Sequence, residues 1–519
     1  MHRNFAWAAA LGAALLLTVL GSGAAQAQPL GSGPAGATPA KAAAPAVPCN
    51  SLSFSPAPGS PLAAGTHTFS VVTADFNGDG RPDVATTNAG SNNVTVLVPT
   101  STGGFSPLAG SPYAVGPTPF SLVAADVNGD GRPDLAIANF ADNTVTVLLN
   151  ISGVIFSAAA GSPFAVGGGP HGVTAADYNA DGRIDLATAN SSTNSVTVLL
   201  GNGAGGFSPG PLSPFAVGLN PVSVAAADFN GDGRPDLAIT NYSDNTVTVL
   251  LNRGLAIFSA AAGSPFAVGT QPYGVLAADL NGDGRPDVAT TNVGSNNVTV
   301  LLGSGTGSFS PAPGSPFTTG SSPVNVKSAD FNGDVRPDLV IVNQNNSNVT
   351  LLLGSGTGNF SAASGSPFAV GIGPESVTAA DFNSDGRPDL ATANFNDSTL
   401  TVLLNTCVLV SPTASPTRTP TNTPTNTPTN TPTGTATPVL LTALSPAKVW
   451  VGVNNSDDAG LRLDVMAEVF LNSTLVKQGQ VNNVSAGSSG FSGAVLNSIA
   501  FGSFSPIAVG PADKLKVKF

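Results

Sequence analysis

Seven copies of a nine-residue acidic loop, Asp-x-Asn-x-Asp-x-x-x-Asp, are the part of this sequence best suited to chemistry. Their first aspartates recur at a constant spacing of 51 residues, from Asp75 to Asp381. Ca²⁺ takes about six to eight oxygen ligands, and a loop with side-chain oxygens at positions 1, 3 and 5 and a backbone carbonyl at position 7 can wrap around it. The loops therefore predict up to seven calcium sites.

Each loop offers oxygen ligands only. Transition metals prefer His or Cys, which the loops lack, and Mg²⁺ resists a cage made wholly of protein oxygens. An EF-hand is excluded, because Thr86 stands where that loop needs a bidentate Glu and the flanking segments read as strands. For one loop alone, the alternative is an Asp/Asn/Gly turn held by its own hydrogen bonds. The predicted ligands, with each Arg acting through its backbone carbonyl, are Asp75, Asn77, Asp79, Arg81 and Asp83; Asp126, Asn128, Asp130, Arg132 and Asp134; Asp177, Asn179, Asp181, Arg183 and Asp185; Asp228, Asn230, Asp232, Arg234 and Asp236; Asp279, Asn281, Asp283, Arg285 and Asp287; Asp330, Asn332, Asp334, Arg336 and Asp338; and Asp381, Asn383, Asp385, Arg387 and Asp389.

The sixth loop differs from the others at position 6, where Val335 replaces Gly. A β-branched residue is strained at positive φ, which the sharp turn of a related calcium loop uses at this position. We therefore expect the site that begins at Asp330 to bind calcium most weakly. Ala180 and Ser384 at position 4 are milder departures that keep every oxygen ligand.

The segments between the loops read as short strands. In residues 219–269, apolar or alternating stretches occupy 222–227, 237–241, 246–251 and 258–268, separated by turn residues. Four strands in each of seven units predict an all-β, seven-bladed β-propeller. A linear β-solenoid is the alternative, but its coils are usually much shorter than this period. The Phe that recurs in every unit is expected in the core: Phe54, Phe105, Phe156, Phe207, Phe258, Phe309 and Phe360.

The ends of the repeat region favour a closed ring. The fourth-strand motif precedes the first loop at Phe54-Ser55 and is missing after the last third strand, so the N-terminal strand should complete the last blade. Cys49 and Cys407 are the two cysteines of the chain and lie almost seven periods apart, which predicts a disulfide across the closure. Two unrelated buried thiols are the alternative.

Composition divides the rest of the chain. Residues 1–27 read as a signal peptide, with an uncleaved anchor as the alternative, and 28–48 as a flexible leader before the propeller at 49–407. A Thr/Pro-rich linker follows at 408–438, then a small β-sandwich-like region at 439–519. Its final strand is either the edge of that domain or the point where the domain is incomplete. No later segment is long and apolar enough to span a membrane.

The charge of the chain follows the loops. The formal net charge is -12, and the loops hold 21 of the 30 acidic residues. Lys and Arg number 18, and seven of these are the loop arginines, so we expect no nucleic-acid partner.

The motif Asp-Phe-Asn-Gly-Asp-Gly-Arg-Pro-Asp followed by Val/Leu-Ala resembles the FG-GAP/VCBS repeat, the unit of the integrin α-subunit propeller and of many bacterial secreted proteins. The resemblance covers about 66–405 and the leading strand. It implies a calcium-loaded seven-bladed propeller and, for bacterial members, surface or extracellular roles in adhesion or carbohydrate binding. Similar repeats also occur in lectins and attached to enzymes, so the resemblance indicates the fold more than one activity.

Residues that do not repeat mark the expected ligand face, opposite the acidic loops. Phe120, His171, Tyr273 and Glu375 are placed in the connection before the first strand, and Phe140, Tyr242 and Phe395 after the second strand. Aromatic and titratable side chains on one rim suit a protein or carbohydrate ligand. The alternative is that these rings only cover blade edges.

The sequence thus predicts a secreted or cell-surface, monomeric, non-catalytic adhesion or interaction module with structural calcium. A lectin-like carbohydrate-binding protein is the first alternative. A secreted hydrolase or lyase, or an enzyme accessory propeller, is the second. Enzyme motifs are lacking, since His67 and His171 are the histidines left after signal cleavage and neither lies in a His-Glu-x-x-His or Gly-x-Ser-x-Gly context.

Overall fold

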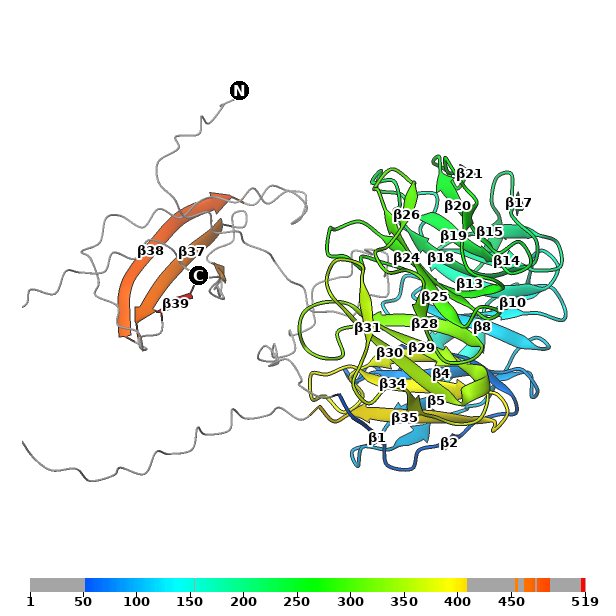
Figure 1. Ribbon diagram of the computed structural model, residues 1–519, viewed down its shortest axis with the longest axis horizontal. Helices are drawn as coiled ribbons and strands as arrows, with labels where there is room; N and C mark the ends of the chain where they lie inside the picture. Colours follow the sequence, from blue (N-terminus) through cyan, green and yellow to red (C-terminus); the bar gives the residue numbers. More distant parts are fainter. Residues whose placement is uncertain are drawn as a thin grey trace, which may run out of the picture. The chain divides into compact units, whose positions relative to one another are not determined.

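The computed structural model describes residues 52–153 and 155–407, and four shorter segments at 453–455, 462–471, 474–485 and 515–518. The first two ranges form seven antiparallel sheets that surround a common centre as the blades of a propeller (Figure 1). In the described residues the single helical element is one 3-10 turn, η1 (Gln344–Asn346). None of the described residues form a helix with the length and hydrophobicity that crossing a membrane needs.

Three strands build the inner part of every blade. The innermost strands are β3 (Thr68–Ala74), β8 (Pro119–Ala125), β13 (Pro170–Ala176), β18 (Pro221–Ala227), β23 (Pro272–Ala278), β28 (Pro323–Ala329) and β33 (Pro374–Ala380). The second strands are β4 (Asp83–Asn88), β9 (Asp134–Asn139), β14 (Asp185–Asn190), β19 (Asp236–Asn241), β24 (Asp287–Asn292), β29 (Asp338–Asn343) and β34 (Asp389–Asn394). The third strands are β5 (Asn93–Pro99), β10 (Thr144–Ile151), β15 (Ser195–Gly201), β20 (Thr246–Asn252), β25 (Asn297–Gly303), β30 (Asn348–Gly354) and β35 (Thr399–Asn405). Blades are numbered 1 to 7 in this order.

The outermost strand is divided into two short pieces, both paired with the third strand. This corrects the expectation of one strand over 258–268. In blade 4 the chain turns between the pieces at Gly263, whose φ is 83°, and the Oγ of Ser264 accepts the N–H of Val249 at 2.9 Å in place of a ladder bond. The pieces are β6 (Phe105–Pro107) and β7 (Tyr113–Ala114), β11 (Ile155–Ala158) and β12 (Phe164–Ala165), β16 (Phe207–Pro209) and β17 (Phe215–Ala216), β21 (Phe258–Ala260) and β22 (Phe266–Ala267), β26 (Phe309–Pro311) and β27 (Phe317–Thr318), β31 (Phe360–Ala362) and β32 (Phe368–Ala369), and, for the last blade, β1 (Phe54–Pro56) and β2 (Leu62–Ala63).

The core lies between adjacent blades. Every residue of the seven second strands is buried, because these strands lie mid-blade with neighbouring sheets against both faces. The recurring Phe packs there as expected. Phe156 of blade 2 meets Phe76 of blade 1 edge-on, with ring centroids 5.6 Å apart, and Phe309 meets Phe229 at 5.4 Å. Such aromatic pairs add to the stabilisation that burial already provides.

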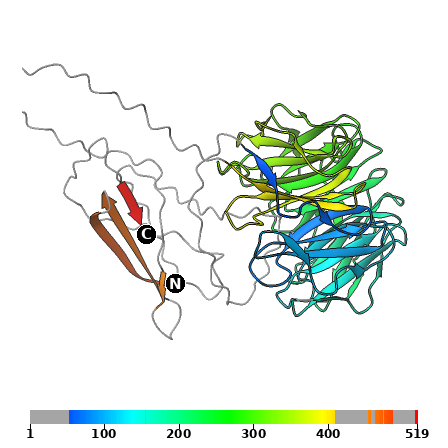
Figure 2. The ribbon, with the colours of Figure 1, turned by 90° about the horizontal axis from the view of Figure 1, so that it is seen from below.

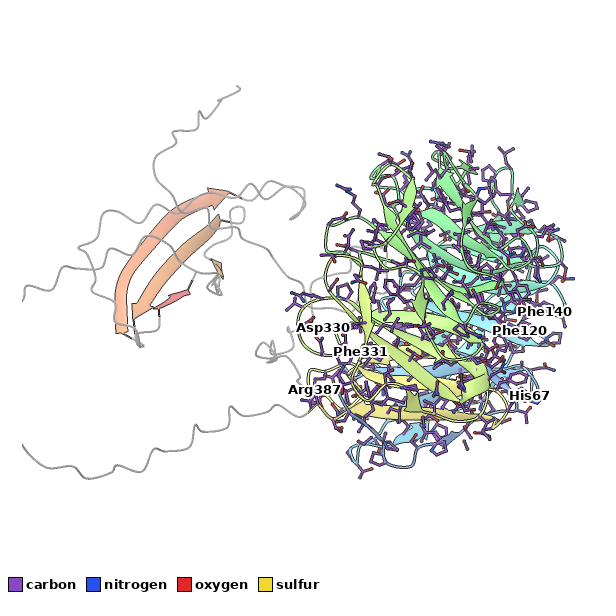
Figure 3. The ribbon with its side chains drawn as sticks, in the orientation of Figure 1. His67, Phe120, Phe140, Asp330, Phe331 and Arg387 are labelled. Atoms are coloured by element: carbon purple, nitrogen blue, oxygen red, sulfur yellow. The ribbon has the colours of Figure 1, made fainter. Side chains whose placement is uncertain are left out.

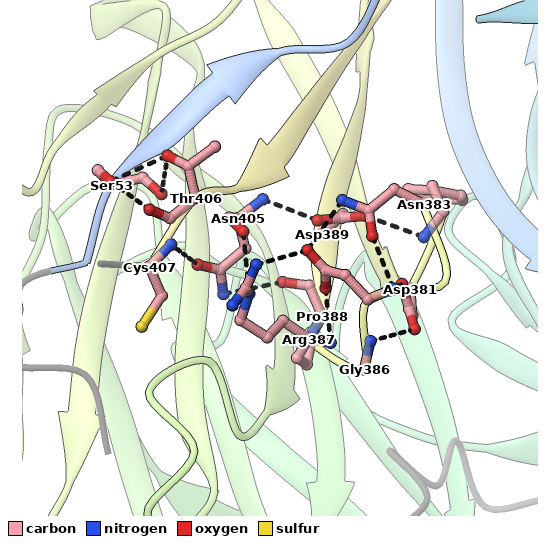
Figure 4. A network of polar contacts seen from close by, with 12 residues as sticks. Ser53, Asp381, Asn383, Gly386, Arg387, Pro388, Asp389, Asn405, Thr406 and Cys407 are labelled. Carbon is pink, nitrogen blue, oxygen red and sulfur yellow. Dashed lines mark hydrogen bonds and ion pairs between the residues drawn. The ribbon is translucent and has the colours of Figure 1, made fainter. Parts of the chain in front are cut away.

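The N-terminal strand closes the ring, as the sequence predicted. β1 pairs with β35 in the sheet that also contains β34 and β33. The N–H of Thr406 donates to the carbonyl of Ser53 at 2.8 Å, and the Ser53 hydroxyl donates to the carbonyl of Thr406 at 3.1 Å (Figure 4). These contacts join positions 353 residues apart in the chain. Both ends of the repeat region are thereby held in one blade, which Figure 2 shows from a second direction.

Several sequence predictions fall outside the described residues. Cys407 is buried at 7% exposure, but Cys49 is not among the described residues, so the disulfide stays a prediction. The signal peptide, the leader and the linker at 408–438 also lie outside them. Near the C-terminus, β36 (Val453–Asn455), β37 (Arg462–Leu471), β38 (Thr474–Ser485) and β39 (Leu515–Lys518) form one antiparallel sheet. This sheet agrees with a β-rich region, while the second layer of a sandwich is not part of what is described.

Candidate functional site

The first aspartate organises each acidic loop from within. In blade 1, Oδ1 of Asp75 accepts the backbone N–H groups of Gly78 at 2.7 Å and Asp79 at 3.1 Å, and Oδ2 accepts that of Gly80 at 2.8 Å. The two glycines have φ of 75° and 83°, which turns the chain back over the carboxylate. The bonds onto positions 5 and 6 recur in all seven loops. Each loop is therefore a turn that its own side-chain-to-backbone hydrogen bonds hold in place.

The aspartate at position 5 is held by its neighbours at positions 3 and 7. Oδ1 of Asp79 accepts the N–H of Arg81 at 2.9 Å, while Oδ2 accepts the Arg81 guanidinium at 2.7 Å and the Asn77 amide at 3.2 Å. Although burial opposes the charged form, these hydrogen bonds hold the pKa of Asp79 below its ordinary value. Six loops form this ion pair, at N–O distances from 2.5 to 3.8 Å; the exception is the sixth loop, with Asp334 and Arg336.

The donor set of the loops consists of oxygen atoms, the type of ligand that a hard cation such as Ca²⁺ prefers. Two features of the folded loops count against a ready-made cation site. Within the described part of the chain, no three or more His, Cys, Asp and Glu side chains gather as a metal site. A cation bound by Asp79 competes with Arg81 and Asn77 for the same carboxylate. The predicted ligands at positions 1, 3 and 5 thus lie in one hydrogen-bonded turn without forming a metal cluster, and the Arg side chain, expected to contribute only its carbonyl, is a competitor.

The aspartate at position 9 anchors the loop to its blade. Asp134 has no exposed surface; its Oδ2 accepts the N–H of Val127 at 3.1 Å and its Oδ1 accepts that of Asn150, in the third strand, at 2.7 Å. Burial raises the pKa of Asp134 to about 7, against these two hydrogen bonds. The other position-9 aspartates show the same upward shift, to about 6 or 7. These carboxylates therefore have a structural role that the sequence motif did not reveal.

Blade 1 lacks one of these anchoring bonds. Pro99 occupies the third-strand position that Asn150 holds in blade 2, and proline has no N–H to donate. Oδ1 of Asp83 is accordingly buried without a hydrogen-bond partner. The first loop is thus the one whose position-9 carboxylate has spare acceptor capacity.

The innermost strands contact one another around the ring, and residues near their starts line the end of a central channel. We call the second residue of each strand, as a set, the channel mouth: Phe69, Phe120, His171, Val222, Tyr273, Val324 and Glu375. Four of these were expected in the preceding connections, which the structure corrects. In six blades the strand already begins at the preceding proline, a residue tolerated at the first position of a strand. The lining residues enclose a cavity of about 60 Å³.

Aromatic rings join the channel mouth into one cluster. The rings of Phe69 and Phe120 stack with centroids 4.4 Å apart, and Phe120 lies 4.9 Å from His171. Oη of Tyr273 lies 3.2 Å from Nε2 of His171. Burial lowers the pKa of His171 to about 4, so this imidazole is neutral at physiological pH.

Glu375 supplies the carboxylate of the cluster. It is 7% exposed, and one of its oxygens, Oε1, accepts a hydrogen bond from the Gln344 amide, while Oε2 is buried without a partner. Burial raises the pKa of Glu375 to about 7, against the hydrogen bond from Gln344. Burial and the charge of Glu375 also raise the pKa of Tyr273, which keeps the phenol protonated.

The remaining predicted face residues surround this mouth from the turns after the second strands. Phe140 lies 4.8 Å from Phe120, and Tyr242 lies 6.3 Å from Tyr273, measured between ring centroids. Phe395 stacks on His67 at 4.5 Å. Figure 3 shows His67, Phe120 and Phe140 at the opposite side of the propeller from Asp330, Phe331 and Arg387, so the aromatic cluster and the acidic loops occupy different faces.

Comparison with known families decides the identity of the repeat. The family described as FG-GAP-like repeat matches six overlapping stretches, at residues 75–137, 126–188, 177–239, 228–290, 279–341 and 330–392. Together they span more than half of the chain. The chain belongs to the FG-GAP-like repeat family. No curated protein matches the FG-GAP chain significantly.

Solved structures similar to this FG-GAP propeller have diverse functions. A catalytically inactive virginiamycin B lyase from Staphylococcus aureus, with quinupristin, shares 13% identity at a TM-score of 0.44, covering 68% of this chain and 98% of that one. A putative 6-phosphogluconolactonase from Bacteroides uniformis shares 13% identity at a TM-score of 0.47, covering 59% and 86%. BBS1N in complex with ARL6DN shares 12% identity at a TM-score of 0.46, covering 70% and 99%. At these values the similarities carry no functional argument.

Sequence reasoning missed Phe69, Val222 and Val324 of the channel mouth, and Gln344 beside it. Phe69 stands one period before Phe120, and Gln344 occupies the repeat position of Phe140, Tyr242 and Phe395. Superposing the seven repeats would have placed both on the ligand face. Contact between Gln344 and Glu375 could not be read in this way, because it joins blade 6 to blade 7.

Proposed function

We propose that this FG-GAP propeller is a secreted or cell-surface, non-catalytic interaction module, stabilised by calcium in its acidic loops and binding a ligand at the channel mouth. The observation that carries the proposal is that two residue sets lie at opposite ends of the innermost strands. Residues that repeat in every blade form the acidic loops at one end. Residues that differ between blades form the aromatic cluster at the other end. Repetition suits a scaffold, and variation suits recognition.

The proposed role of calcium is structural. Extracellular modules typically bind calcium with a Kd of about 10⁻⁴ to 10⁻³ M. At such a Kd, millimolar calcium raises the free energy of unfolding by roughly 0.4–1.4 kcal/mol per site, or about 3–10 kcal/mol over seven sites. Thermal unfolding of the full chain in calcium and in EDTA tests this. We expect a large fall in melting temperature in EDTA, and identical melting curves would contradict the proposal.

The mouth supports binding better than catalysis. Glu375 is the one carboxylate among the residues that line it, whereas glycoside hydrolysis commonly needs two. His171 is neutral, and its Nε2 faces Tyr273 instead of a nucleophile. Because the residues that line the mouth include no second catalytic group to act with Glu375, these features support a non-enzymatic role.

A protein ligand is our first candidate, and a carbohydrate is the second. The half-buried rings of Phe140 and Tyr242 around the mouth favour the carbohydrate, because sugar rings stack on such surfaces. A glycan array and a pull-down with the full chain, each repeated in EDTA, would separate the two. Phe140→Ala and Tyr242→Ala should weaken the true interaction, whereas substitution of exposed Leu212, which lies outside this face, should not. Retention of all binding by both aromatic variants would contradict the placement of the ligand at the mouth.

A further inference from the structure

We propose that the channel mouth binds a primary ammonium group, with Glu375 as its anion and the surrounding rings as its walls. This inference deepens the proposed ligand-binding role and rests on it, since it names the chemistry of the group that the mouth accepts.

The first step concerns the carboxylate. Glu375 is 7% exposed, and Oε2 has no hydrogen-bond partner although Oε1 is bonded to Gln344. An unpaired buried acceptor is costly, because it has lost its water without gaining a donor. The N–H groups of a bound ammonium would supply that donor and the opposite charge together.

The second step concerns the walls. Phe69, Phe120, His171 and Tyr273 line the same cavity as Glu375. Their rings lie 4.4 to 5.8 Å from neighbouring rings of the cluster, so several aromatic faces and edges meet around one small space. Aromatic faces attract cations through the ring quadrupole, and the attraction grows when water is excluded. The lining of the mouth thus combines one carboxylate with aromatic rings, the two kinds of group that attract a cation.

The third step concerns the remaining charges. Among the residues lining the mouth, none carries a positive charge, because His171 is neutral near pH 7. Tyr273 on β23 and Gln344 on η1 are uncharged neighbours of Glu375. Lys327, on the neighbouring innermost strand β28, is buried with its pKa lowered by burial, but it is not among the residues that line the mouth. No lining residue neutralises the carboxylate, which leaves that role to a ligand.

The size of the cavity selects the kind of cation. At about 60 Å³ it is far smaller than the roughly 300–1,000 Å³ of pockets that enclose whole small molecules. It suits the tip of a side chain or of a slender amine. A guanidinium carries five donors in a plane, and most would stay unpaired beside one free carboxylate oxygen, whereas a compact ammonium needs fewer acceptors.

The test uses the full chain in calcium at pH 8, titrated with n-butylammonium chloride and separately with n-butanol, with binding followed by ligand-observed NMR. We expect butylammonium to bind the wild type and to bind Glu375→Gln about tenfold more weakly or worse, since a buried charge pair is lost. The matched control is Asp142→Asn, which removes an exposed carboxylate from the turn that also contains Phe140 and should change affinity less than twofold. Equal binding by wild type and Glu375→Gln, or equal binding of butanol, would overturn the proposal.

A pH titration of the wild type tests the proposal without depending on how the Glu375→Gln variant folds. Lowering the pH from 8 to 5.5 protonates Glu375 and should weaken butylammonium binding several-fold; binding that does not change with pH would also overturn the proposal.

Two capped amino acids identify the source of the ammonium. Nα-acetyl-lysine amide binding more tightly than butylammonium would support a lysine of a protein partner, and the reverse order would support a free amine. Tighter binding of Nα-acetyl-arginine amide than of the lysine compound would overturn the choice of ammonium. A partner protein captured equally by wild type and Glu375→Gln would refute this inference while leaving the interaction role intact.

Discussion

Oη of Tyr273 lies 3.2 Å from Nε2 of His171, although the two residues are 102 positions apart and the innermost strand of blade 4 lies between theirs in the chain. This contact ties blade 3 to blade 5 at the channel mouth. Tyr273→Phe removes the hydrogen bond and keeps the ring, so we expect a loss of about 0.5–1.5 kcal/mol in the free energy of unfolding, measured by urea denaturation. Tyr242→Phe is the control, because no hydrogen bond of its hydroxyl is found among the described residues, and it should be close to neutral. Equal losses in both variants would contradict the structural role of the contact.

Glu375 should make stability fall as pH rises. Its pKa is raised from 4.5 to about 7 in the folded protein, so the folded state retains a proton that the unfolded state has already released. The free energy of unfolding therefore decreases between about pH 4.5 and 7, and the full penalty, roughly 3 kcal/mol, is present above pH 7. Glu375→Gln should remove this part of the pH dependence in urea unfolding curves. Parallel pH profiles for the variant and the wild type would show that Glu375 is not the responsible group.

Val335 should weaken the sixth loop through its backbone conformation. It has a φ of 71°, in the left-handed region, where its equivalents are glycines at φ of 80° to 84°. Val335→Gly should raise the free energy of unfolding by about 1 kcal/mol and tighten calcium binding at this loop. Gly386→Val in the seventh loop is the reciprocal change and should lower stability by a similar amount. Calorimetry and urea unfolding of both variants check this, and a destabilised Val335→Gly variant would contradict it.

The loop arginines should oppose calcium. Arg132 forms an ion pair with Asp130 at 2.5 Å, so a cation that uses this carboxylate must displace the guanidinium. We expect Arg132→Gln to increase calcium affinity at the second loop by up to about fivefold, the equivalent of a surface ion pair. Arg336→Gln is a matched control, since it removes the same charge from the one loop without this ion pair. Equal gains in both variants, measured by calcium titration calorimetry, would show that net charge and not the ion pair is responsible.

Much of this protein could be predicted from its sequence because the information repeats locally. The 51-residue period, the alternating strands and the leading Phe54 segment predicted seven blades and closure by the N-terminal strand, and the structure confirms both. The family match confirms the resemblance read from the loop motif. The break in the outer strand was not predicted, although Gly263, Ser264 and Pro265 inside the expected strand are turn-forming residues.

Tertiary structure alone decided which of the non-repeating residues lie together. Glu375, Tyr273 and His171 looked like scattered members of separate connections, and they meet because seven innermost strands converge on one axis. In the same way, the sequence predicted that the arginine at position 7 contributes only its backbone carbonyl, whereas the structure shows its side chain in an ion pair with the aspartate at position 5. The physical reason is that periodicity specifies contacts within a blade and between equivalent positions, whereas contacts among unlike residues depend on the distances that ring closure imposes.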